Sequence, residues 1–110
     1  SHENNINRKL KTYEITMNMV KENMGIGEIA KKRQLTISTI LNHLTKYLEE
    51  DNKENFNINF NDVFTEKEEN QIISIIKKVG CERLHPIKEL LPEDIGYDKI
   101  KAVIIKNYAL

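Results

Sequence analysis

The stretch that decides the fold is IGEIAKKRQLTISTILNHL, residues 26–44. Its first part, residues 26–33, has the apolar spacing of a short helix with Ile29 and Ala30 facing inward. Thr36 follows a brief polar turn, and its hydroxyl can accept a hydrogen bond from a first-turn N–H of a second helix. That second helix is predicted from apolar residues at every third or fourth position, namely Ile37, Ile40, Leu41, Leu44 and Leu48.

Two helices joined by a three-residue turn have two interpretations. One is a helix-turn-helix, in which the small Ala30 lets the helices approach over a shared apolar wedge. The other is an ordinary corner in a helical domain, and the pattern alone leaves both open. The face opposite the apolar stripe favours the first, because it lacks the repeated Glu/Lys pairs of a merely solvated helix. It carries Ser38, Asn42, Thr45, Lys46 and Glu49, with Thr39 near it.

This polar face has side chains of the kinds that contact DNA. Ser, Thr and Asn can hydrogen-bond base edges or phosphates, and a helix N-terminus can hold a phosphate. The basic run at residues 31–33 either complements the dipole of the shorter helix or contacts the phosphate backbone. His43 lies on the flank, as a packed histidine or a phosphate contact. The predicted DNA-binding residues are Lys31, Lys32, Arg33, Thr36, Ser38, Thr39, Asn42 and Lys46.

Further helices are predicted on both sides of this stretch. Before it, an apolar stripe indicates a helix that Thr12 would cap and that stops near Gly25. After it, Thr65 and Glu68 form a capping box for a helix that ends at Gly80. A short helix over residues 86–91 and a last helix from Tyr97 complete the series. The residues expected to face inward in these helices are Tyr13, Met17, Val20, Met24, Ile72, Ile73, Ile76, Val79, Ile100, Val103, Ile104 and Tyr108.

The predicted fold is therefore all-α, a small winged-helix-like helix-turn-helix domain with at most one short strand or wing. The possible strand lies in the Asn-rich stretch where Phe56, Ile58 and Phe60 alternate with polar residues. We expect an N-terminal tail over residues 1–11 and a three-helix unit over 12–50. An acidic polar linker or wing over 51–64 leads to a C-terminal helical unit, 65–110, packed on the first.

Charge divides the chain although the formal net charge is zero. Residues 8–47 hold eight Lys or Arg against three Glu, whereas residues 48–70 hold eight acids against two Lys. A neutral total argues mildly against strong nonspecific nucleic-acid binding. The uneven distribution indicates either a basic unit followed by an acidic belt or a solvated linker beside a Lys-rich helix surface. No apolar run approaches the roughly 20 residues of a membrane span. The single cysteine, Cys81, cannot form an internal disulfide and fits a reducing cytosol.

Catalytic signatures are missing from the sequence. It contains no Gly-rich phosphate loop and no ATPase box, so we expect no enzyme activity and no cofactor in this segment. Cys81 and His85 stand four positions apart, but structural zinc normally takes four ligands and few others are at hand. We expect neither a metal site nor a catalytic cysteine.

The sequence resembles a known family. Residues 12–50 and the stretch VFTEKEENQIISIIKKVGCERLHPIKELLPEDIGYDKIKAVI, residues 63–104, look like the helicase-associated helix-turn-helix domain. That domain occurs at the C-termini of many bacterial RecQ-type ATP-dependent DNA helicases, and a related segment occurs in the Werner helicase. The most specific parts are EIA at 28–30, LTISTILNHL at 35–44, and ERLHPIKELL with its flank. One departure is Gln34, which stands where many such turns have Gly and would cost about 1 kcal/mol if its φ is positive.

The resemblance implies an accessory DNA-binding domain that holds duplex or forked DNA, as a monomer in the bacterial cytoplasm near the nucleoid. ATP and Mg²⁺ would belong to an upstream motor in the parent protein. A protein-interaction module that keeps the shape without binding DNA is the alternative, and a free-standing transcription regulator is a third class. In the second half, residues 86–107 either form a second helix-turn-helix with Lys99, Lys101 and Lys106 exposed, or close the core.

Overall fold

Six α-helices form within residues 10–50 and 57–109, the part of the chain that the computed structural model describes. A π-helical turn, η1 Ile105–Ala109, prolongs the last of them. These residues contain no strand, and one isolated bridge pairs Gly25 with Asn59. The predicted all-α class is confirmed, while Phe56 of the suggested strand lies outside the described residues. The helices are α2 Thr12–Lys21, α3 Ile26–Arg33, α4 Ile37–Glu49, α5 Glu66–Val79, α6 Leu84–Glu89 and α7 Tyr97–Ile104.

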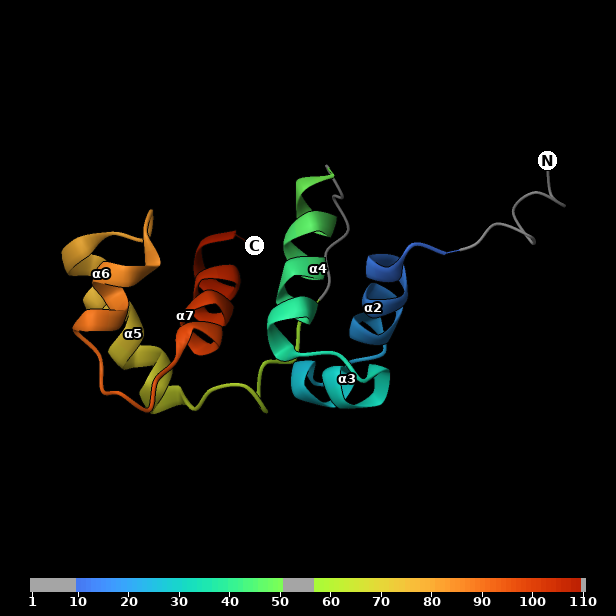
Figure 1. Cartoon of the computed structure of the whole chain (residues 1–110), viewed down its shortest axis with the longest axis horizontal. Coiled ribbons are helices and arrows are strands. Elements are labelled where there is room, and N and C mark those ends of the chain that lie inside the picture. The colour runs from blue at the N-terminus through green and yellow to red at the C-terminus, as the bar shows by residue number, and fades with distance from the viewer. Residues whose placement is uncertain (1–9, 51–56, 110) are drawn as a thin grey trace, which may run out of the picture.

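Helix α4 stands at the centre of the arrangement (Figure 1). It packs against α2 on one side and α7 on the other, while α3 crosses at its lower end. Helices α5 and α6 lie on the far side of α7. Because α4 is the longest of the first three helices and has the most regular apolar stripe, it can be covered by neighbours on two flanks and still present a polar face.

One hydrophobic core runs through both halves of the chain. Its fully enclosed side chains include Ile26, Ile29, Ile40, Leu44, Ile72, Ile87 and Ile100. Two residues predicted to face inward do not: Val79 is 43% exposed and Tyr108 is 47% exposed. Both lie in the last turn of a helical segment, where the stripe continues in the sequence but no neighbouring element covers it. No helix in the described ranges is long and apolar enough to cross a lipid bilayer.

The helix ends show which local signals were sufficient. The Thr65 hydroxyl accepts from the Glu68 N–H at 3.1 Å and the Glu68 carboxylate accepts from the Thr65 N–H at 2.9 Å, which confirms the capping box. Gly80 ends α5 with a φ of 80°, as predicted. The prediction for Thr12 was wrong, because Thr12 is already the first residue of α2 and Lys11 is the N-cap. The N–H of Lys11 is satisfied by the carboxylate of Glu14 at 3.1 Å.

The segment before α5 caps α3 from a distance. Asp62 accepts two hydrogen bonds, from the N–H groups of Gly27 and Glu28, both at 2.9 Å. The Ile26 N–H donates to the Asn59 carbonyl at 3.1 Å. A carboxylate here also meets the positive end of the helix dipole. Residues 57–64, the described part of the expected linker or wing, therefore bind the first half, and Phe60, Val63 and Phe64 are buried in the core.

Candidate nucleic-acid interface

Gln34, in the turn between α3 and α4, adopts the left-handed conformation that favours glycine. Gln34 has φ 57° and ψ 42°, and the next N–H, of Leu35, donates back to the Ala30 carbonyl at 2.9 Å. A non-glycine residue in this region carries strain of about 1 kcal/mol. Thr36 then caps α4, as predicted, by accepting from the Thr39 N–H at 3.1 Å. Two hydrogen bonds thus fix the geometry of α3, the turn and α4. One joins the Leu35 N–H to a carbonyl of α3, and the other joins the Thr36 hydroxyl to the first turn of α4.

Polar contacts between α2 and α4 hold the second helix of the motif in place. The Thr16 hydroxyl, fully buried, lies 2.7 Å from Nδ1 of His43. Lys21 donates to the Tyr47 hydroxyl at 3.2 Å, and the Tyr13 hydroxyl donates to Glu50 beyond the end of α4. These contacts lie along the C-terminal half of α4, from His43 to the C-cap residue Glu50, and they hold α2 and α4 together.

Arg33 belongs to the same internal network. Its guanidinium donates to the Thr12 carbonyl at 2.8 Å, to the Thr12 hydroxyl at 2.9 Å and to the Thr16 hydroxyl at 2.6 Å. Arg33 therefore ties the end of α3 to the start of α2. The phosphate contact predicted for this side chain would have to break or share those bonds.

The ring of His43 lies beside Thr16 and Arg33. Burial, and secondarily the positive charge of Arg33, lowers the pKa of His43 below its ordinary value. Because Thr16 accepts from Arg33, its own proton is available for Nδ1 of His43. Of the two interpretations of His43 from the sequence, the structure supports the packed histidine.

The outward face of α4 has the composition expected of a DNA-contacting helix. Asn42, Thr45 and Lys46 are exposed there, and Ser38 and Thr39 are half-buried. The Thr39 hydroxyl lies 2.9 Å from that of Thr36, so these two groups are engaged with each other. The ammonium of Lys46 lies 5.7 Å from the centre of the Tyr13 ring, toward the α2 flank.

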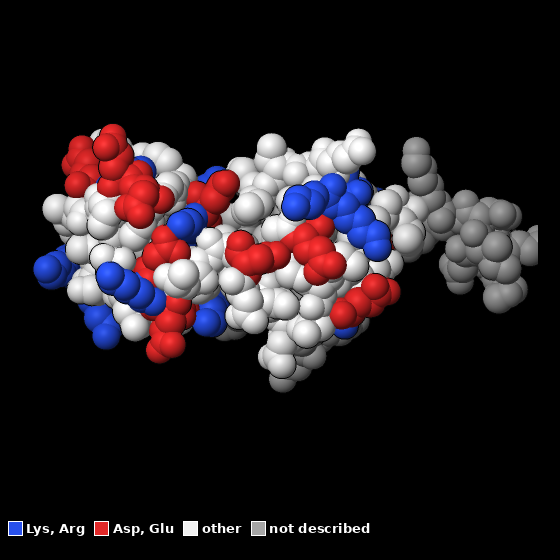
Figure 2. Space-filling model, turned by 90° about the horizontal axis from the view of Figure 1, so that it is seen from below, with Lys and Arg blue, Asp and Glu red and all other residues white. Residues whose placement is uncertain are grey.

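Basic side chains at the α3 end lie beside acidic ones (Figure 2). Lys31 and Lys32 are exposed in the last turn of α3. Seen from this end, however, the molecule shows basic and acidic groups interspersed (Figure 2). Glu28, at the other end of the same helix, is among the exposed acids. Any affinity for a polyanion therefore depends on which individual lysines reach it.

The sequence did not predict which part of the chain lies next to the outward face of α4. The outward side of α4 borders a hollow of about 300 Å³ whose opposite wall comes from the second half of the chain. Its lining residues are Leu41, Asn42, Thr45, Cys81, Leu84, Lys101, Ile104 and Ile105. A helical wheel assigns Asn42 to a face but cannot say which helix stands beside it. No local signal could have placed Lys101 there.

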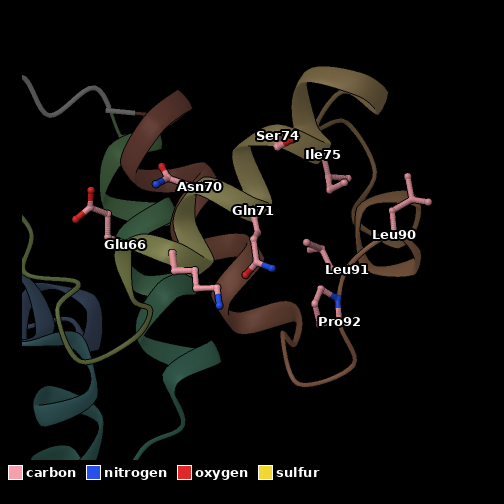
Figure 3. Close-up of a pocket in the computed structure, with 9 residues that line it drawn as sticks. Glu66, Asn70, Gln71, Ser74, Ile75, Leu90, Leu91 and Pro92 are labelled. Carbon is pink, nitrogen blue, oxygen red and sulfur yellow. The ribbon is translucent and has the colours of Figure 1, made fainter.

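A second, larger groove lies on α5, away from the first motif. It has a volume of about 730 Å³, and Figure 3 shows Ile75 on α5 with Leu90, Leu91 and Pro92 across from it. Leu90 is 56% exposed, the most exposed large apolar side chain among the described residues. Polar groups of α5, including Gln71, complete the groove.

Metal-ligating side chains do not gather in the described ranges: no group of three or more His, Cys, Asp or Glu there could hold an ion. His85, one of the pair noted in the sequence, contacts Glu89 at 2.8 Å and the Tyr97 hydroxyl at 3.2 Å. Cys81 is a free, half-buried thiol.

Comparison with known proteins gives one match. The sequence profile of a helix-turn-helix domain matches residues 12–104, which includes both halves of the molecule. No curated protein and no solved structure is significantly similar to the chain.

Proposed function

Because the chain belongs to this helix-turn-helix domain family, we propose that it is a non-catalytic accessory DNA-binding domain of a RecQ-like ATP-dependent DNA helicase. It would hold duplex or forked DNA while a motor elsewhere in the parent protein, with its own ATP and Mg²⁺, unwinds the strands. The observation that carries the proposal is the exposed face of α4, where Asn42, Thr45 and Lys46 stand clear of the core.

The side chains of α4 and of the end of α3 have different roles in the proposal. Asn42, exposed on α4, would hydrogen-bond a base edge in the major groove, where Asn recognises adenine. Lys46, Lys31 and Lys32 would contact phosphates, which fix orientation without reading sequence. Ser38, at the N-terminal end of α4, would donate to a phosphate at the positive end of the helix dipole.

The assignment to a RecQ-like parent rests on the second half of the chain. The stretch around residues 82–104 resembles the helicase-associated domain, and a free-standing regulator would not need it. A regulator would also be expected to dimerise, because such proteins usually read paired half-sites. A monomer that binds forked DNA better than duplex would support the helicase role.

The proposal is tested by fluorescence anisotropy of the intact chain with duplex, forked and single-stranded DNA over a salt series. Three or four phosphate contacts predict a log–log slope of roughly −3 to −4 on duplex. Replacing Lys31 and Lys32 together with Met should make the slope shallower by about 1.8, because two contacts are lost. Absence of binding at low ionic strength would contradict the proposal.

The groove on α5 favours a second candidate, a protein-interaction module of the same parent. Leu90 and its neighbours expose apolar surface that DNA would not use. Leu90→Ser separates the two functions, since DNA affinity should be unchanged in this variant if the outward face of α4 is the DNA-binding surface.

A further inference from the structure

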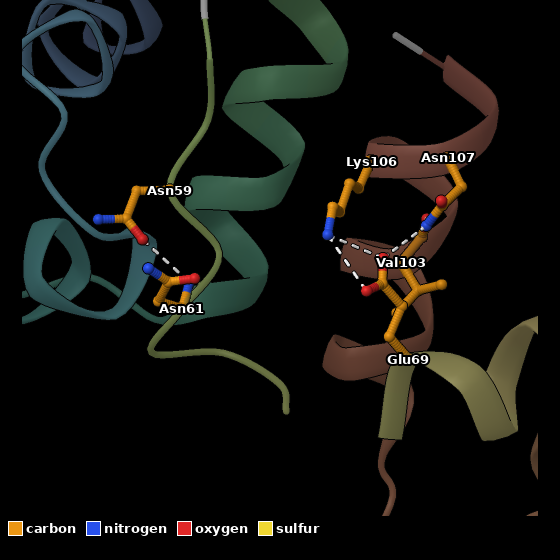
Figure 4. A network of polar contacts seen from close by, with 6 residues as sticks. All are labelled: Asn59, Asn61, Glu69, Val103, Lys106 and Asn107. Carbon is orange, nitrogen blue, oxygen red and sulfur yellow. Dashed lines mark hydrogen bonds and ion pairs between the residues drawn. The ribbon is translucent and has the colours of Figure 1, made fainter. Parts of the chain in front are cut away.

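The lysines of the last helix differ in what they contact. Lys99 is paired with Glu68 of α5, in a contact with 31% and 16% of the two side chains exposed. Lys106 is paired with Glu69 of α5 at 3.0 Å, and Asn107 donates to the same carboxylate at 3.0 Å (Figure 4). Two of the three bases considered for a second helix-turn-helix therefore hold α7 and its extension η1 to α5.

Lys101 is the exception. Within the described ranges no acid lies in salt-bridge distance of it. It lines the hollow beside α4, opposite Asn42 and Thr45, and is half-buried. A lysine in such a position packs its aliphatic stem on apolar neighbours and keeps the ammonium in water. Here those neighbours include Leu84 and Ile104.

The electrostatics of the hollow favour an anion. Lys101 is the one charged residue among those that line it, and none of the others is an acid. Asp98 lies one turn earlier on α7, in a separate hollow with Ile37. A negatively charged group in this hollow would therefore meet Lys101, Asn42 and Thr45, and no carboxylate is among the lining residues.

The two flanks of α4 now each carry a base. Lys46 lies toward α2, beside the Tyr13 ring, and Lys101 lies on α7, across the opposite flank. A helix seated in the major groove, roughly 12 Å wide, has a phosphate backbone on both sides. Lys46 and Lys101, one on each flank of α4, would each face one of these two phosphate backbones.

We propose that Lys101 is a DNA phosphate contact, so that the second half of the chain forms part of the DNA-binding surface as well as supporting the core. The inference rests on the proposed function, because it takes α4 as the helix that meets DNA. It also gives a role to the packing of α7 beside α4. In this arrangement α7 would place Lys101 next to the phosphate backbone on the side of the major groove opposite Lys46.

The test is Lys101→Met in the intact chain, with anisotropy on duplex DNA across a salt series. Met keeps the aliphatic stem and removes the charge. We expect affinity near 100 mM salt to fall roughly fivefold and the log–log slope to become shallower by about 0.9, the effect of one lost phosphate contact. Lys101→Gln should act alike and Lys101→Arg should retain the affinity, with thermal unfolding of each variant measured in parallel.

Lys67→Met is the matched control. Lys67 is an exposed base on α5, and α7 separates α5 from α4. It should leave both affinity and slope unchanged. Equal losses in the Lys67 and Lys101 variants would show a nonspecific effect of net charge and overturn the proposal.

Lys46→Met separates this inference from the proposed function. Loss of affinity with Lys46→Met but not with Lys101→Met would overturn the role of α7 and leave α4 as the DNA-binding helix. Loss in both variants, with wild-type thermal stability, would support the bridged surface. Absence of DNA binding by the unmodified chain would overturn both.

Discussion

Each half of the molecule contributes three helices, and the two halves place their charges differently. In the first half, Lys31 and Lys32 have no acid within salt-bridge distance among the described residues and point to solvent. In the second half, Lys99 and Lys106 are paired with the acids of α5. Lys99 and Lys106 therefore hold the second half together, whereas Lys31 and Lys32 remain available to a partner. Lys101 is the one lysine of α7 and η1 that, like Lys31 and Lys32, has no acid within salt-bridge distance among the described residues.

The largest expected effect asks whether the two halves are one folding unit. Leu44→Ala in the first half and Ile100→Ala in the second each remove a fully buried side chain. Each should lower the free energy of unfolding by about 2–5 kcal/mol. Because one core runs through both halves, urea unfolding followed by circular dichroism should show a single transition that either variant shifts. Two transitions, each shifted by only one of the variants, would show that the halves unfold independently.

The next effect tests the link between the halves at Asp62. A Cβ at Gly25 would lie 2.4 Å from a carboxylate oxygen of Asp62, so Gly25→Ala must displace this cap. Asp62→Ala should cost about 0.5–2 kcal/mol, the range for a lost N-cap, and Gly25→Ala at least as much. The double variant should cost less than the sum, because both changes disrupt one contact. Strict additivity in thermal unfolding would contradict the distant cap.

A smaller effect distinguishes the halves by pH. The pKa of His43 is lowered, first by burial, so the unfolded chain takes up a proton before the folded chain does. The stability that neutral His43 provides is present above about pH 6.5 and declines as pH falls below it. His43→Gln should abolish the loss of stability in this window, measured by urea unfolding from pH 7.5 to 5.5.

The second half should respond only at lower pH. The hydrogen bond from Lys99, followed by that from the Thr65 N–H, lowers the pKa of Glu68 below its ordinary 4.5. Its stabilising effect is therefore present above that value and lost as pH falls through the lowered pKa. Glu68→Gln should be less stable than the parent at pH 6, by about 1 kcal/mol or less, and the difference should shrink below pH 4.5. A difference that is constant with pH would contradict the ion pair.

The smallest expected effect concerns the turn of the motif. Gln34→Gly removes the strain of a positive φ but adds freedom to the unfolded chain, so the net gain should be below about 1 kcal/mol. The melting temperature should rise slightly and DNA affinity should not change. A fall in melting temperature would show that the Gln34 side chain contributes more than the strain costs.

The difference between the halves also marks how far the sequence could be interpreted. Thr36, Thr65 with Glu68, and the stripe through Ile40 and Leu44 act over three or four residues, and all were predictable for that reason. The exposure of Asn42 and Lys46 follows from the same stripe. Val79 misled because periodicity persists past the last covering neighbour.

Contacts across long separations were beyond local patterns. Asp62 caps a helix more than thirty positions earlier, and only the close approach of Gly25 and Gly27 to its carboxylate explains those glycines. From the sequence, Arg33 was a candidate phosphate contact and Lys99 a candidate exposed base, but the fold gives each a partner within the protein. Lys101 became a candidate only when α7 was seen to stand beside α4.

The most direct test of the central claim is an NMR titration of the ¹⁵N-labelled intact chain with a short DNA duplex. We predict that the largest amide shifts fall on the outward face of α4, at Asn42, Thr45 and Lys46, and extend to Lys101. Shifts concentrated at Ile75, Leu90 and Leu91, or an unchanged spectrum at low ionic strength, would contradict the account.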